Sequence, residues 1–156
     1  MTRNRMIVLA LVAALVAVNV GLLLQARTAR ADDRSREQAM AAAEQRLPLL
    51  LGYNAGSLAE DLATAGEQTT GAFDADYAKI LDEVVKPRAM EAGVTTQAEV
   101  RGTAVVSSSD DEVVVLAFLT QSTTTRGGTP TIAGSRVEVT MKRAGGGWKV
   151  AGLEPV

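Results

Sequence analysis

The sequence changes its hydrophobic periodicity once, near residue 93, and this change constrains the fold more than any single motif. Residues 32–92 are rich in Ala, Glu, Leu and Arg with apolar residues at helical spacing, whereas residues 94–153 are rich in Val and Thr and alternate with a period of two. Helices therefore precede strands along the chain. That order is typical of an α+β domain in which helices cover one face of an antiparallel sheet.

Three helices are expected in the first part. The first covers about residues 32–51 and is disturbed at Pro48, which has no amide to donate. A capping box of Ser57 and Glu60 starts the second, and Asp74 is the expected N-cap of the third. We expect Pro87 to bend or end the third helix and Gly93 to close the region. The buried face predicted for the third helix comprises Tyr77, Ile80, Leu81, Val84 and Val85.

Four strands are expected in the second part, over about residues 94–106, 113–119, 136–142 and 148–153. Polar or glycine-rich turns separate them, and residues 145–147 are three consecutive glycines. The sequence therefore predicts a four-stranded antiparallel meander under the helices. The inward side predicted for the first strand comprises Val94, Ala98, Val100, Ala104 and Val106.

Before both parts lies an apolar run, Met6–Leu24, in which 17 of 19 residues are apolar and none is charged. As a helix it is about 28 Å long, close to the thickness of the hydrocarbon core of a bilayer. We expect a short cytoplasmic leader (1–5), a single transmembrane helix (6–24), a juxtamembrane helical stalk with the first helix (25–52) and an extracytoplasmic α+β domain (53–156). The alternative is a cleaved signal peptide, since Ala29-Arg30-Ala31 fits the small-x-small pattern.

Composition excludes several classes of chemistry. The chain has no cysteine and no histidine, which removes thiol nucleophiles, Cys/His metal sites and imidazole proton relays. Residues 32–156 contain 12 basic and 18 acidic side chains, so no basic surface for nucleic acid is expected. The carboxylates at 110–112 fit a solvated turn better than a cation site. We therefore predict no catalytic, cofactor-binding or metal-ligating residues and a protein that is not an enzyme.

Two groups of residues are candidates for binding. The first could line a cavity in the domain, although the aromatic members fit core packing equally well; it comprises Tyr53, Phe73, Tyr77, Val100, Val139 and Met141. The second could contact a partner protein, through a strand edge or an aromatic side chain near a glycine turn; it comprises Thr120, Thr123, Thr124 and Trp148.

A string of short motifs follows the N-terminal apolar run and covers essentially the whole chain: Thr70-Gly71-x-Phe73-x-x-x-Tyr77, Val84-Val85-Lys86-Pro87, Val105-Val106-Ser107, Val113-Val114-Val115-Leu116, Gln121-Ser122-Thr123-Thr124, Ser135-Arg136-Val137, Trp148-Lys149-Val150 and Leu153-Glu154-Pro155-Val156. Together with the apolar run, this string resembles the Mce-associated membrane proteins of actinobacteria. The resemblance implies a cystatin-like cone, shared with SnoaL-like and nuclear-transport-factor-two-like proteins. It also implies an accessory subunit of an Mce complex, which imports lipids or sterols across the cell envelope.

Three other functions remain open. A membrane-anchored assembly factor of a type IV secretion or conjugation system would share the anchor and the cone. A secreted carrier of a small lipid would use a cleaved N-terminal segment and a ligand cavity. An enzyme is the third, because the cone fold also hosts isomerases and dehydratases, but the inward strand positions are apolar and no histidine is present.

Overall fold

The computed structural model describes residues 32–156. The chain divides into two compact units, Met1–Arg34 and Ser35–Val156, and the fold described below is that of the second unit. The predicted leader and the predicted transmembrane helix over 6–24 lie outside the described residues. Within residues 32–156, no helix combines the length and the apolar character needed to cross a membrane.

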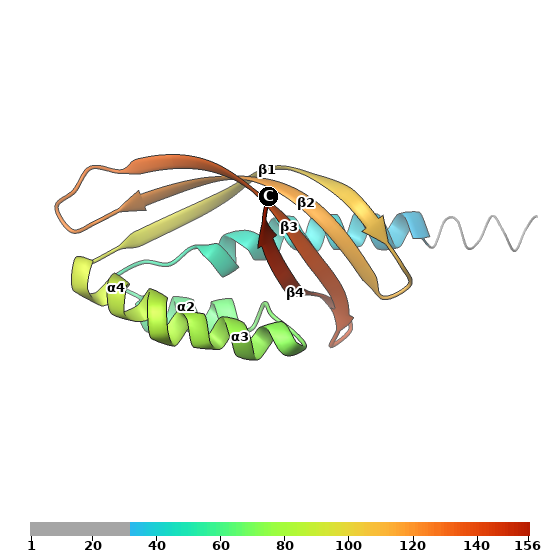
Figure 1. Cartoon of the computed structure of the whole chain (residues 1–156), viewed down its shortest axis with the longest axis horizontal. Helices are drawn as coiled ribbons and strands as arrows, with labels where there is room; N and C mark the ends of the chain where they lie inside the picture. Colours follow the sequence, from blue (N-terminus) through green and yellow to red (C-terminus); the bar gives the residue numbers. More distant parts are fainter. Residues whose placement is uncertain (1–31) are drawn as a thin grey trace, which may run out of the picture. The chain divides into compact units, whose positions relative to one another are not determined.

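The helical layer begins with a helix that ends at residue 51. It continues with α2 (Leu58–Gly66), α3 (Ala72–Ile80), a π-helical turn η1 (Leu81–Val85) and α4 (Lys86–Ala92). Helices α2, α3 and α4 lie together on one side of the sheet (Figure 1). The predicted order of helices followed by strands is confirmed, and the domain is α+β.

The sheet is a four-stranded antiparallel meander with the spatial order β1-β2-β3-β4, as predicted. Its strands are β1 (Thr95–Ser108), β2 (Glu112–Thr124), β3 (Thr131–Ala144) and β4 (Gly147–Pro155). Gly145 and Gly146 both have positive φ, 60° and 81°, which suits the tight turn between β3 and β4. The strands extend further than predicted because their Thr-rich ends pair with one another without an apolar side that periodicity can detect.

The core lies between the N-terminal helix and the sheet. Ala39, Ala43 and Leu47 have no exposed surface, and their spacing of four residues makes them one face of the helix. The alanines allow the helix to approach the sheet closely. The inner face of the sheet supplies the other half of the core, through Val113, Val115, Ala117, Leu119, Val137, Val139, Met141, Trp148 and Val150.

Tyr77 joins α3 to the end of the N-terminal helix. It is buried, its ring stacks on Phe73 at a centroid distance of 5.6 Å, and its hydroxyl donates a hydrogen bond to the carbonyl of Leu50. Burial raises the pKa of Tyr77 to about 12. This contact fixes the chain immediately before it turns toward β1.

The predicted capping of two helices is wrong. The Ser57 side chain does not cap α2; its hydroxyl donates instead to Oδ2 of Asp61, four residues later, at 2.9 Å. The residue before α3 is Gly71, with φ 70°, and Asp74 lies inside the first turn, where it accepts a hydrogen bond from the Thr69 hydroxyl. Competing side-chain partners therefore replaced both predicted caps.

Pro48 and Pro87, the two prolines in the helical region, do not end their helices. Residues 48–51 remain helical after Pro48, and α4 continues through Pro87 to Ala92. The π-helical turn η1 directly precedes α4, and such a wider turn accommodates the ring and the missing amide of a proline. Gly93, in the left-handed region with φ 59°, ends the helix as predicted. The predicted buried face is only partly correct, since Ile80 and Val84 are 47% and 45% exposed.

A β-bulge corrects the prediction for β1. The register with β2 shifts between Val100 and Gly102, so Arg101 is the extra residue. An extra residue inverts the alternation beyond it. Ala104 consequently points to solvent, while Val105 packs against the core. Val106, which was also predicted to point inward, is the extra residue of a second register shift between Val105 and Ser107 and is exposed.

Candidate functional site

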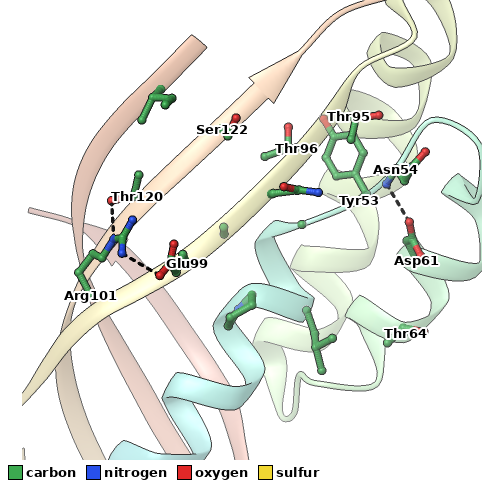
Figure 2. Close-up of a pocket in the computed structure, with 16 residues that line it drawn as sticks. Tyr53, Asn54, Asp61, Thr64, Thr95, Thr96, Glu99, Arg101, Thr120 and Ser122 are labelled. Carbon is green, nitrogen blue, oxygen red and sulfur yellow. Dashed lines mark hydrogen bonds and ion pairs between the residues drawn. The ribbon is translucent and has the colours of Figure 1, made fainter. Parts of the chain in front are cut away.

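A groove of about 600 Å³ lies beside β1. The end of the N-terminal helix, the loop after it and α2 form one side, and β1 with the adjoining parts of β2 and β3 forms the other (Figure 2). Its lining residues are Pro48, Leu49, Gly52, Tyr53, Asn54, Asp61, Thr64, Thr95, Thr96, Gln97, Ala98, Glu99, Arg101, Thr120, Ser122 and Ile132.

The loop after the N-terminal helix reaches the edge of β1 at one point. Tyr53 and Thr96 form an antiparallel bridge in which each amide donates to the other carbonyl at 2.8 Å. Gly52 makes this approach possible, because a Cβ there would lie 2.6 Å from the Pro48 carbonyl oxygen. The groove therefore begins where the chain first touches the sheet edge.

A small hydrogen-bond cluster holds this loop in place. Oδ2 of Asp61 accepts from the Asn54 amide at 2.7 Å and from the Ser57 hydroxyl. The Thr95 hydroxyl accepts from the Ala55 amide at 3.2 Å, which links the loop to the start of β1. All these groups are exposed, so each bond contributes modestly to stability. Figure 2 shows the loop residues Tyr53 and Asn54 beside Thr95 and Thr96.

The opposite end of the groove carries an ion pair. The Arg101 guanidinium lies 2.8 Å from Oε1 of Glu99 and donates to the Thr120 hydroxyl at 3.2 Å. Both charged side chains are more than half exposed, so the pair is screened by solvent. With Asp61, the groove has two acidic side chains and one basic side chain.

The groove is suited to hydrogen bonding and weak ion pairing. Asp61 and Glu99 already accept hydrogen bonds from neighbouring groups. Within residues 32–156, no group of carboxylates converges in a way that could hold a metal ion. Such a surface can recognise a main chain and polar side chains.

The structure distributes the candidate cavity residues over two places. Tyr53 lines the groove. Tyr77, Val139 and Met141 are buried in the core, and Phe73 and Val100 pack against it.

The candidate partner-contacting residues are also separated. Thr120 lines the groove, and Thr123 lies within 3.4 Å of the Thr96 hydroxyl. Because β2 pairs with β1 on one side and β3 on the other, the main chain at Thr120 and Thr123 is not a free edge, and Thr124 is paired with Thr95 of β1. Trp148 is 4% exposed, with the Arg143 guanidinium 4.6 Å from its ring centroid, so it is a core residue.

Most polar residues of the groove gave no signal in the sequence. Glu99 and Arg101 fit the wet side of an alternating strand, and Asp61 fits the first turns of a helix. The bridge between Tyr53 and Thr96 and the hydrogen bond from the Ala55 amide to Thr95 bring these segments together. The glycine at position 52, directly after a helix, was the one local indication of a close approach.

Searches against family models gave no match. In sequence, the chain is 32% identical over 122 residues to outer membrane protein Rv1973 of Mycobacterium tuberculosis, covering 78% of this chain and 76% of that protein. It is 34% identical over 126 residues to an uncharacterised protein of the same organism, Rv1362c, covering 80% of this chain and 57% of that one.

Solved structures share the fold at low sequence identity. An IcmL-like type IV secretion system protein from Legionella pneumophila matches with a TM-score of 0.66 at 10% identity, over 78% of this chain and 91% of that one. CagV, a VirB8 homologue from Helicobacter pylori, matches with 0.60 at 16%, over 74% and 94%. A putative aromatic ring hydroxylase from Novosphingobium aromaticivorans matches with 0.50 at 12%, over 80% and 93%.

The helices, the curved four-stranded meander and these matches define the fold as a cone, like that of VirB8-like and nuclear-transport-factor-two-like domains. Within this fold class, the sequence identity and coverage identify a narrower group: the chain belongs to the family of the mycobacterial outer membrane protein Rv1973.

Proposed function

We propose that this protein is a non-catalytic subunit of a protein complex in the cell envelope and acts through protein–protein contacts. The observation that carries the proposal is the cone fold shared with IcmL-like and VirB8-type proteins of type IV secretion systems. The name of the relative Rv1973 as an outer membrane protein supports the envelope, and so does the apolar run at 6–24.

The solved structures favour an assembly factor of the VirB8 kind. Such a protein holds other subunits together, and an open polar groove beside a sheet edge suits that task better than a closed ligand cavity. The domain would lie outside the cytoplasmic membrane, as it does in the periplasmic domain of DotI, with the N-terminal segment as its anchor.

The second candidate is an accessory subunit of an Mce-type lipid importer. It is supported by the string of motifs that resembles the Mce-associated proteins across the chain, and by relatives in an actinobacterium. Both candidates place the protein in a membrane complex and differ in the other subunits.

Purification identifies the complex. The full chain, tagged at its C-terminus and expressed from its own promoter, is purified from membranes in mild detergent, and recovered proteins are quantified against an untagged strain. Secretion ATPases or coupling proteins would support the assembly factor, whereas Mce substrate-binding and permease subunits would support the importer. Recovery of the chain alone, with and without chemical crosslinking, contradicts the proposal.

Two further experiments test the alternatives of a secreted lipid carrier and an enzyme against the proposal. A mature protein that starts near Asp32 and is found free in the medium would contradict the anchor. Turnover of a sterol or acyl compound by the purified chain would contradict a non-catalytic role. The loss of that turnover in Tyr53→Phe would place it in the groove.

A further inference from the structure

The edge of β1 has main-chain groups to which no backbone group of residues 32–156 is bonded. In an antiparallel sheet, successive residues of an edge strand point their amide and carbonyl alternately toward the neighbouring strand and away from it. Thr96 points outward, since it pairs with Tyr53, so Ala98 and Val100 point outward as well. In the part of the chain that the structure describes, no other backbone group bonds to the outward side of these two residues.

The groove is lined by Ala98 and, on either side of Val100, by Glu99 and Arg101. Gly52 and Tyr53 meet β1 at Thr96, and the chain before them belongs to the N-terminal helix, which does not continue the pairing. Pro48 and Leu49, near the end of that helix, form the opposite wall, and Leu49 is 45% exposed. Gly52 also lies near the Ala98 amide, since a Cβ on it would be 3.8 Å from that nitrogen. The groove beside Ala98 is therefore bounded by Gly52 and has one apolar wall.

We propose that the edge of β1 at Ala98 and Val100 binds an extended segment of a partner protein, which adds a strand to the sheet next to the Tyr53 bridge. The inference rests on the proposed function, because it names the surface through which the subunit would act. Main-chain hydrogen bonds provide the binding energy in this mode, and alternate side chains provide specificity.

The groove also defines the chemistry of the segment. Side chains of an added strand alternate between the two faces of the sheet. Those on the inner face would contact Leu49, which favours an apolar residue. Those on the outer face would lie beside Glu99, and the charged lining residues are two acids and one base, which favours a basic residue.

The bulge at Arg101 argues against a second copy of this chain as the occupant. Two copies pairing antiparallel about Glu99 would bring residue 102, just past the bulge, opposite Thr96 of the other copy, where Tyr53 is already bound. Bulges commonly protect edge strands from such pairing. A short segment from another protein avoids both obstacles.

The first test uses the full chain in detergent micelles and amide hydrogen exchange. In the free protein, the amides of Ala98 and Val100 should exchange at least about 100-fold faster than those of Gln97 and Glu99, which point toward β2. An acetylated, amidated heptapeptide of alternating valine and lysine, at millimolar concentration, should slow exchange at Ala98 and Val100 at least about tenfold. The same peptide N-methylated at alternate amides cannot complete the strand and should not protect them.

Two outcomes of this test would overturn the proposal. One is equal protection of all four amides in the free protein. The other is no added protection by the unmethylated peptide, or equal protection by the methylated one.

The second test uses the native complex. Ala98→Pro removes one outward amide and is tolerated on an edge strand, whereas Ala98→Ser keeps the amide. The proline variant should recover at least about tenfold less partner than the serine variant, with exchange protection of Val115 and Val139 unchanged as proof of folding. Equal recovery would overturn the edge proposal and leave the proposed function standing.

If no partner is recovered with the wild-type chain while the peptide still protects Ala98 and Val100, the proposed function fails and the edge proposal stands. A dimer of the wild-type chain in sedimentation that Ala98→Pro dissociates would assign the edge to a second copy and overturn the choice of a foreign segment.

Discussion

Each edge of the sheet is bonded to one loop, but the two loops differ in how they are held in place. At β4, residues 68–70 bond to Val150, with the Val150 amide donating to Gln68 at 2.9 Å and the Thr70 amide donating to Val150 at 2.8 Å. At β1, Tyr53 bonds to Thr96 through two similar bonds. Each edge thus receives one loop that follows a helix.

The loop at β4 is buried, whereas the loop at β1 is largely exposed. Gln68 and Thr69 are 7% and 3% exposed, Gln68 is held by Arg46 at 2.6 Å, and β4 itself contributes Trp148 and Val150 to the core. The loop at β1 is fixed mainly by exposed hydrogen bonds to Asp61 and Thr95. Each edge is therefore paired at one residue, but the bridge at β4 is buried beside the core, whereas the bridge at β1 borders the groove.

The largest expected effect is on the β4 side. Trp148→Ala should lower the free energy of unfolding by about 4 kcal/mol, because it empties a buried site of large volume. Tyr53→Ala, at the half-buried aromatic residue of the β1 edge, should cost about 1 kcal/mol. Urea titrations of the full chain in detergent, followed by circular dichroism, measure both. Equal costs would contradict the contrast between the edges.

Alkaline pH should loosen the segment that leads to the β1 edge. Tyr77 donates to the carbonyl of Leu50, and its pKa in the folded chain is about 12, above the usual value of about 10. The unfolded chain therefore loses this proton first, so the free energy of unfolding is unaffected below about pH 10 and falls between pH 10 and 12, by on the order of 2 kcal/mol.

Urea titrations at a series of pH values measure this loss. Tyr77→Phe should remove the part of the slope between pH 10 and 12 that belongs to this hydroxyl, at the cost of one hydrogen bond. An unchanged slope in the variant would mean that other groups cause it.

An effect of about the same size is expected at the turn into the groove. Gly52→Ala should cost about 2 kcal/mol, since its Cβ would lie 2.6 Å from the backbone oxygen of Pro48 and the Tyr53 bridge must shift. Gly66→Ala, at the end of α2 with no atom within 4 Å of the new Cβ, should be neutral or stabilising by about 0.5 kcal/mol. Faster amide exchange at Thr96 in the first variant alone would locate the damage at the β1 edge.

The smallest effect concerns the exposed cluster. Asp61→Ala removes the acceptor for the Asn54 amide and the Ser57 hydroxyl and should cost about 1 kcal/mol. Ser57→Ala removes only one of these bonds and should cost about half as much. Exchange at the Asn54 amide, which should rise in the first variant and stay unchanged in the second, checks the assignment.

Local rules predicted the elements well where one side chain pattern decided the outcome. The alternation at Val137, Val139 and Met141 placed β3 correctly, and Gly93 ended its helix as expected. They failed where a distant or competing group intervened. The Ser57 hydroxyl donates to Asp61 and does not cap its helix, and a π-helical turn before Pro87 lets the helix continue through the proline.

The candidate site was harder to predict than the fold. Aromatic residues suggested a cavity, yet Tyr77 and Phe73 belong to packed helices, and the groove has mainly polar walls. A polar residue that lines a groove and one that faces bulk solvent follow the same alternation, so periodicity cannot separate them.

The sequence by itself determined the α+β class, the order of helices and strands, and the meander, because apolar spacing and glycine turns are local properties of the chain. The tertiary structure alone decided which edge of the sheet borders the groove. That outcome depends on the bulge at Arg101, on Tyr53 meeting Thr96 and on Gln68 being buried beside β4. These features are contacts between residues distant in sequence or changes in strand register, and the local hydrophobic pattern predicts neither kind.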